Sequence, residues 1–215
     1  MFVTKRLNRI AKMSLFAILL AASLFLLPGK NVEAASTKTK ALKAYSKLLA
    51  KSTIEWGDTG YTMDLSECKF QIIYLDDNSV PELLIYGPYT STDLSSSYQV
   101  LLYTYKNGKA KYVAEFYSNV SYYKKKGIIT DQLYTAASTI DYYYKFSGTK
   151  VRRKLAKSIY QMSTYYYTKY SGSEATYITK AKFNASLKKL VGSKKAKTVS
   201  YHKNTAANRK KYLLS

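Results

Sequence analysis

Cysteine and histidine are almost absent from this sequence. Its 215 residues include one of each, Cys68 and His202. A single cysteine excludes a disulfide framework within the chain, and one cysteine with one histidine is too few for a Cys/His zinc site. Cys68 opens the apolar stretch CKFQIIYL, so we expect it to be a buried filler. No acidic residue occurs among the last forty to orient His202, so we interpret it as a surface histidine and not as a general base.

Acidic residues are also scarce. The chain has 13 Asp and Glu against 35 Lys and Arg, a formal net charge of +22, and only five of the basic residues are Arg. Lysine is a hydrated point charge on a flexible stem, which suits diffuse attraction to polyanions better than bidentate recognition. Charged residues make up 22% of the chain and hydrophobic ones 47%, so the sequence predicts a folded protein despite its charge.

One long hydrophobic run occurs, Met13 to Leu27, after four basic residues among the first twelve. As a helix these fifteen residues would span about 22 Å, short of the ~30 Å hydrocarbon core of a bilayer. Val32-Glu33-Ala34 then offers small residues at the positions that a signal peptidase reads. The pattern predicts a signal peptide over residues 1–34 and a secreted protein, in the medium or at the cell wall, with no stable membrane anchor after processing.

The rest, residues 35–215, is predicted to be a single α+β domain. Leu42, Tyr45 and Leu49 recur at helical spacing and predict an amphipathic helix near its start. From Cys68 onward the pattern is that of strands, and we expect an antiparallel meander of about six to eight. Asn107-Gly108 predicts a hairpin with a type I′ turn, because both turn residues need positive φ. One or two C-terminal helices follow, the first with Thr179 as its N-cap.

A short segment, FQIIYLDDNSVPELLIYG, carries a resemblance. It is similar to a loose group of secreted or lipoprotein-like proteins of Gram-positive bacteria in which a strand runs into D-x-D-x-D-G-x-P-E-L. The similarity continues through YKNGK, YITKAKFNASLKKL and NTAANRKKYL, over roughly residues 65 to 215. Most members of this group have no known activity, so the resemblance implies location and fold and adds little on function. Tyr74 stands where the group's first Asp would be, and Ser79 replaces its Gly.

Two interpretations of this turn remain open. Asp76, Asn78 and Glu82 could surround a calcium ion with oxygens. With Asp77 counted they supply three or four ligands, whereas Ca²⁺ takes six to eight. The alternative is a hairpin turn in which Asp76 and Asn78 accept hydrogen bonds from nearby backbone N–H groups. The ligand count favours the turn, and we expect no other cofactor.

Tyrosine alternating with lysine is the most unusual feature, with 24 Tyr in the chain. In one interpretation these tyrosines fill half-buried strand positions. In the other, exposed rings stack on sugars or bases while lysines attract phosphate or carboxylate. Consecutive tyrosines must expose at least one ring unless both faces of the strand are covered. The candidate ligand-binding residues are Lys124, Lys125, Lys126, Tyr142, Tyr143, Tyr144, Arg152, Arg153, Tyr165, Tyr166 and Tyr167.

Catalytic patterns are poorly represented. GxSxG, HExxH and P-loop motifs do not occur in the sequence, and we find no nucleophile–base pair, so we name no catalytic residue. Composition and targeting favour a secreted, non-catalytic, basic, Tyr-rich protein whose partner is an anionic cell-wall polymer, glycan or other extracellular polymer. The alternative is an extracellular hydrolase or inhibitor that acts on the wall or on host material.

The signal peptide gives a first prediction. If residues 1–34 are removed, the secreted protein should begin at Ala35 or within a residue or two of it. Intact-mass measurement of protein purified from the culture medium checks this. Full-length chain recovered with the membrane would contradict it.

Overall fold

The computed structural model describes residues 30–57, 60–90, 96–117, 119–161 and 163–215. The chain divides into two compact units, residues 1–36 and 37–215. In the first unit the structure describes the beginning of helix α2 (Lys30–Leu49), so the predicted signal segment lies for the most part outside the described residues. All the strands, the other two described helices and both hydrophobic cores belong to the second unit.

Seven strands form the first sheet, and all their pairings are antiparallel. β4 is central, because it pairs with β2, β3 and β5, while β6 pairs with β5 at one edge. The strands are β1 (Thr53–Glu55), β2 (Thr62–Asp64), β3 (Lys69–Ile73), β4 (Glu82–Thr90), β5 (Ser96–Lys106), β6 (Lys109–Phe116) and β14 (His202–Lys203).

Seven more strands form the second sheet, again antiparallel. Six of them are joined in sequence order as a meander, and β13 adds to the β7 edge. The strands are β7 (Asn119–Tyr123), β8 (Ile128–Tyr134), β9 (Ser138–Ser147), β10 (Lys150–Tyr160), β11 (Thr164–Ser171), β12 (Glu174–Tyr177) and β13 (Lys197–Thr198). Two helices, α3 (Lys180–Val191) and α4 (Ala206–Leu213), lie near the C-terminus.

The predicted α+β class is confirmed as a largely antiparallel β fold with helices, but the predicted strand number is wrong. The described residues form 14 strands instead of six to eight, and these make two sheets instead of one meander. Five strands are only two to four residues long, too short for a period of two to be recognised. Two of the five, β13 and β14, come from the C-terminal segment and join strands far earlier in the chain.

Local signals were more dependable than the strand count. Asn107 and Gly108 both have positive φ, 52° and 81°, and they connect β5 to β6 as the predicted turn. Thr179 is the N-cap of α3, and its side chain accepts a hydrogen bond from the Lys182 backbone N–H at 3.3 Å. These predictions are confirmed because each depends on the conformation of a few neighbouring residues.

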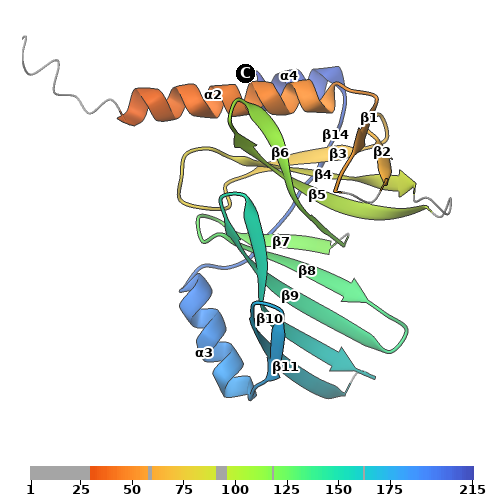
Figure 1. The fold of residues 1–215 in the computed structure, drawn as a ribbon, viewed down its shortest axis with the longest axis vertical. Coiled ribbons are helices and arrows are strands. Elements are labelled where there is room, and N and C mark those ends of the chain that lie inside the picture. The colour runs from red at the N-terminus through yellow and green to blue at the C-terminus, as the bar shows by residue number, and fades with distance from the viewer. Residues whose placement is uncertain (1–29, 58–59, 91–95, 118, 162) are drawn as a thin grey trace, which may run out of the picture. The chain divides into compact units, whose positions relative to one another are not determined.

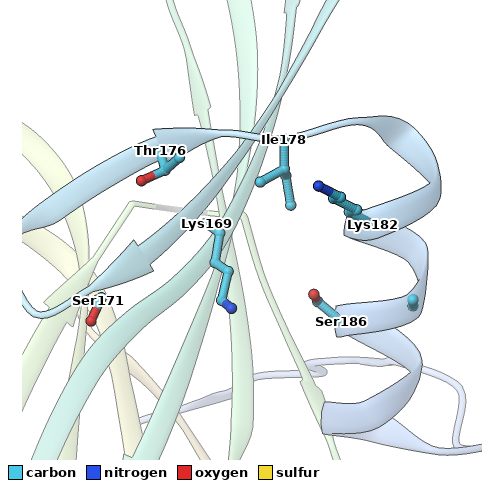
Figure 2. Close-up of a pocket in the computed structure, with 7 residues that line it drawn as sticks. Lys169, Ser171, Thr176, Ile178, Lys182 and Ser186 are labelled. Atoms are coloured by element: carbon cyan, nitrogen blue, oxygen red, sulfur yellow. The ribbon is translucent and has the colours of Figure 1, made fainter.

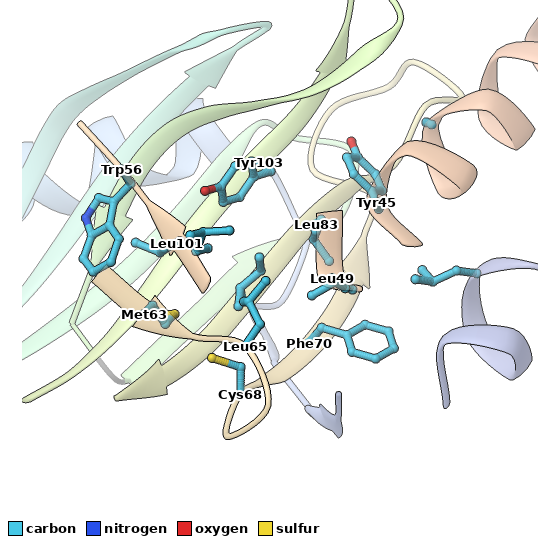
Figure 3. Close-up of a cluster of buried hydrophobic side chains, with 14 residues drawn as sticks. Tyr45, Leu49, Trp56, Met63, Leu65, Cys68, Phe70, Leu83, Leu101 and Tyr103 are labelled. Carbon is cyan, nitrogen blue, oxygen red and sulfur yellow. The ribbon is translucent and has the colours of Figure 1, made fainter. Parts of the chain in front are cut away.

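The first sheet is buried on both faces. Leu83, Leu84 and Ile85 follow one another along β4, and none is exposed to solvent. Successive strand residues point to opposite faces, so Leu83 and Ile85 enter one hydrophobic core and Leu84 enters another. The first core also contains Tyr45 and Leu49 of α2 (Figure 3). The second core joins the two sheets, because it includes Ile129 and Phe146 of the second sheet and Leu84 of the first.

Helix α3 covers part of the second sheet on the face turned away from the first (Figure 1). Its anchor is Phe183, which is 3% exposed. The Phe183 ring centroid lies 5.8 Å from that of Tyr143 on β9 and 5.1 Å from that of Tyr167 on β11. Within residues 37–215 the order of layers is therefore α2 with α4, the first sheet, the second sheet and α3.

Glu82 gives a prediction about stability. Its side chain is 1% exposed, and one carboxylate oxygen accepts a hydrogen bond from the Leu75 backbone N–H at 3.0 Å. Burial raises the pKa of Glu82 to about 8, from 4.5 in the unfolded chain. Between these values the folded state holds a proton that the unfolded state has lost. This group should therefore make the free energy of unfolding fall as pH rises from 5 to 8, by at most about 1.4 kcal/mol per pH unit.

Urea unfolding at pH 5, 6.5 and 8 tests this expectation. Glu82→Gln should remove the contribution, so the free energy of unfolding of the variant should increase relative to that of the wild type as pH rises. Glu67→Gln is the matched control, since Glu67 is exposed and should leave the slope unchanged. Parallel pH profiles of Glu82→Gln and the wild type would contradict the assignment.

Candidate functional site

The positive charge of the chain is concentrated in one stretch of sequence. Residues 119–198, which form the second sheet and α3, contain 17 Lys and Arg against three acidic residues, a net charge of +14. Residues 30–117, which form α2 and strands β1 to β6, contain ten of each, a net charge of zero. We call residues 119–198 the basic region.

The three acidic side chains of the basic region offset little of this charge at the surface. Asp131 is 2% exposed and accepts a hydrogen bond from the Tyr117 backbone N–H at 3.1 Å. Burial raises the pKa of Asp131 to about 6, although Arg153 and the hydrogen bonds oppose the shift. Asp141 is half-buried and accepts a hydrogen bond from the Gln132 side chain at 2.6 Å. Glu174 is the acidic side chain that is exposed.

The tyrosines of the first triplet are divided between the two faces of β9. Tyr144 faces the first sheet, with its ring centroid 5.4 Å from that of Phe116, and Tyr142 lies 6.0 Å from Tyr144 on the same side. Tyr143 lies on the other face, under Phe183 of α3. All three are half-buried, so both faces are covered here and no ring of this triplet stands free in solvent.

Arg153 lies among three tyrosine rings, two of them from this triplet. Its guanidinium carbon is 4.1 Å from the ring centroid of Tyr142, 5.1 Å from that of Tyr170 and 5.6 Å from that of Tyr144. Such cation–π contacts are strongest when the cation is partly desolvated, as it is here. Arg153 therefore acts mainly in packing, whereas Arg152 beside it is exposed.

The second triplet contains exposed rings. Tyr165 and Tyr166 are 51% and 44% exposed, while Tyr167 packs on Phe183. The Lys157 ammonium lies 5.5 Å from the Tyr165 ring centroid. Tyr177 on the neighbouring strand is 77% exposed, and its ring lies 6.0 Å from that of Tyr166. Sequence reasoning missed Tyr177, since it is a lone tyrosine on a four-residue strand.

Lys124, Lys125 and Lys126 form the β7–β8 turn, which is held against the first sheet. The Lys125 backbone N–H donates to the Tyr74 carbonyl at 3.0 Å, and the Lys145 ammonium donates to the Lys126 carbonyl at 2.7 Å. The side chains of Lys124 and Lys125 remain exposed. Strands β9 and β10 lie between this hairpin and β11. The structure therefore does not gather the predicted residues into one site, and it distributes them over the second sheet.

In the turn after β3, Asp76 and Asn78 accept hydrogen bonds from backbone N–H groups, as the hairpin-turn interpretation predicts. One Asp76 carboxylate oxygen accepts from the Asn78 backbone N–H at 3.2 Å, and the Asn78 side-chain oxygen accepts from the Val80 backbone N–H at 2.7 Å. Glu82 is buried with Leu75. Within the part of the chain that the structure describes, no three His, Cys, Asp or Glu side chains are grouped so that they could hold a metal ion.

The single histidine and the single cysteine are both engaged in contacts within the fold. The His202 ring stacks on that of Tyr212, with centroids 3.7 Å apart. Cys68 is buried, as predicted, and its thiol lies 3.0 Å from the Asp64 carbonyl. Burial raises the pKa of the Cys68 thiol to about 12, which keeps it protonated at neutral pH.

Comparison with known proteins gives no match. No protein-family model, curated protein or solved structure matches this chain. Among the described residues, no helix is long and apolar enough to cross a membrane.

The turn at Asp76 gives a prediction about calcium. If its oxygens serve the backbone, neither millimolar Ca²⁺ nor EDTA should change the melting temperature. A site filled at a hundred times its Kd would add about 2.7 kcal/mol to the free energy of unfolding, a shift of several degrees. Thermal unfolding measured with each addition decides between the two. A calcium-dependent rise that Asp76→Ala abolishes would show that the turn binds metal.

Proposed function

We propose that this chain is a secreted, non-catalytic protein that associates with an anionic polymer of the cell wall or another extracellular polyanion. The observation that supports this most strongly is the segregation of charge. The basic region has a net charge of +14, whereas residues 30–117 have a net charge of zero and residues 199–215, with β14 and α4, add +4. A solvated surface that served solubility alone would not require most of the charge to lie on one sheet and one helix.

The residue types suit a polymer better than a small ligand. Lysine dominates the basic region, and its flexible ammonium groups attract phosphate or carboxylate without demanding one geometry. The exposed rings of Tyr165, Tyr166 and Tyr177 stand in the same region and offer apolar faces on which sugar rings can stack. Charge would provide long-range attraction that is sensitive to salt, and the rings would provide short-range contact that is less so.

Two charge variants test whether the basic region carries the binding. The first variant replaces four exposed lysines of that region by Gln: Lys188, Lys189, Lys194 and Lys195. The matched control replaces four exposed lysines on or next to α2 by Gln: Lys40, Lys43, Lys47 and Lys51. Both lose the same charge, so a difference between them reports position and not net charge.

Retention on purified bacterial cell walls is measured across a salt series from 0.01 to 0.15 M. Screening lengths shorten from about 30 Å to about 8 Å over this range, so wild-type retention should fall steeply. The basic-region variant should elute at clearly lower salt than the α2 control. Equal elution of the two variants, or equal retention on walls stripped of their polyanions, would contradict the proposal.

A further inference from the structure

A pocket of about 540 Å³ opens between β11, β12 and α3 (Figure 2). The strands contribute Lys169, Ser171 and Thr176, and the helix contributes Lys182 and Ser186. In Figure 2 the Lys182 and Ser186 side chains point from the helix toward the strands, and the Lys169 ammonium lies between the strands and the helix. Ile178 and Ala185 add small apolar surfaces.

Register and helical spacing bring these polar groups together. Lys169 is the cross-strand partner of Thr176, and Ser171 is two residues further along β11, so all three side chains lie on the same face of the sheet. Lys182 and Ser186 are four residues apart on α3 and therefore share one face of the helix. Phe183 fixes that helix on the sheet by packing on Tyr143 and Tyr167. The pocket is thus a consequence of how α3 is anchored.

Charge in the pocket is of one sign. None of the described residues that line it is acidic. Within the described part of the chain, the ammonium groups of Lys169 and Lys182 form no hydrogen bond or ion pair. Two ammonium groups and three hydroxyl-bearing side chains thus line one pocket without a protein acceptor for the charges.

We propose that this pocket binds a phosphate group of a phosphodiester-linked polyol chain, an inference that rests on the proposed association with an anionic polymer. A phosphodiester shares its one negative charge between two non-bridging oxygens of a tetrahedral centre, which accept from ammonium and hydroxyl donors, and its two ester oxygens are weaker acceptors. The hydroxyls of the polyol can both donate to and accept from Ser171, Thr176 and Ser186. Its carbon chain can lie on Ile178 and Ala185.

Isothermal titration at 0.15 M salt tests the pocket with two probes, a glycerol-phosphate hexamer and a galacturonate hexamer of similar charge. The pocket variant is Lys169→Gln with Lys182→Gln. Its matched control is Lys180→Gln with Lys197→Gln, two exposed lysines outside the pocket lining. The pocket variant should weaken binding of the glycerol-phosphate hexamer by about tenfold or more, a loss of about 1.4 kcal/mol in binding free energy. The control should weaken it by much less.

A second variant separates hydrogen bonding from charge. Thr176→Val with Ser186→Ala keeps every lysine and should still weaken binding of the glycerol-phosphate hexamer severalfold, with an unchanged melting temperature. Equal losses in the pocket variant and its control would overturn the pocket while leaving a general attraction to polyanions intact. Equal affinity of the wild type for the two hexamers would overturn the preference for phosphate. Absence of binding to either hexamer, together with no retention on walls, would overturn the proposed function itself.

Discussion

Burial of the first sheet on both faces is the constraint from which the rest of this structure follows. The central strands β4 and β5 alternate their side chains between two cores, one under α2 and one against the second sheet. Consecutive buried residues in a strand require cover on both sides, because each neighbour points the opposite way. The middle residues of these strands, Leu83–Ile85 and Val100–Leu102, are therefore not open to a ligand, and they hold the two layers on either side in place.

The second sheet is less completely buried than the first. Tyrosine rings pack at many of its positions, where aliphatic side chains pack in the first sheet, and the tyrosine hydroxyl can reach the rim of a core. Tyr143 and Tyr167 support Phe183, and Tyr142 and Tyr144 surround Arg153. This use of tyrosine lets a lysine-rich sheet retain a packed interior while its outer positions stay charged. Stability and a basic surface are thus compatible in the same strands.

Features that depend on a few neighbouring residues could be predicted from the sequence. The turn at Asn107-Gly108 and the cap at Thr179 belong to this group, because φ preference and capping are local properties. The division into two sheets could not be predicted, since β13 and β14 are two-residue strands paired with segments more than seventy residues away. The enclosure of Arg153 and the pocket beside α3 depend on the same long-range packing. For the tyrosine triplets, sequence left open which rings are covered, and the positions of α3 and of the first sheet decide this.

The most direct test of the account is to map where an anionic polymer touches the folded protein. Hydrogen–deuterium exchange of the purified protein would be compared with and without a saturating polyol-phosphate polymer at 0.15 M salt. The account predicts slower exchange in β11, β12 and α3, with exchange in α2 and β1 to β6 unchanged. Protection centred on α2 or the first sheet, or spread evenly along the chain, would contradict the claim that the basic region is the binding surface.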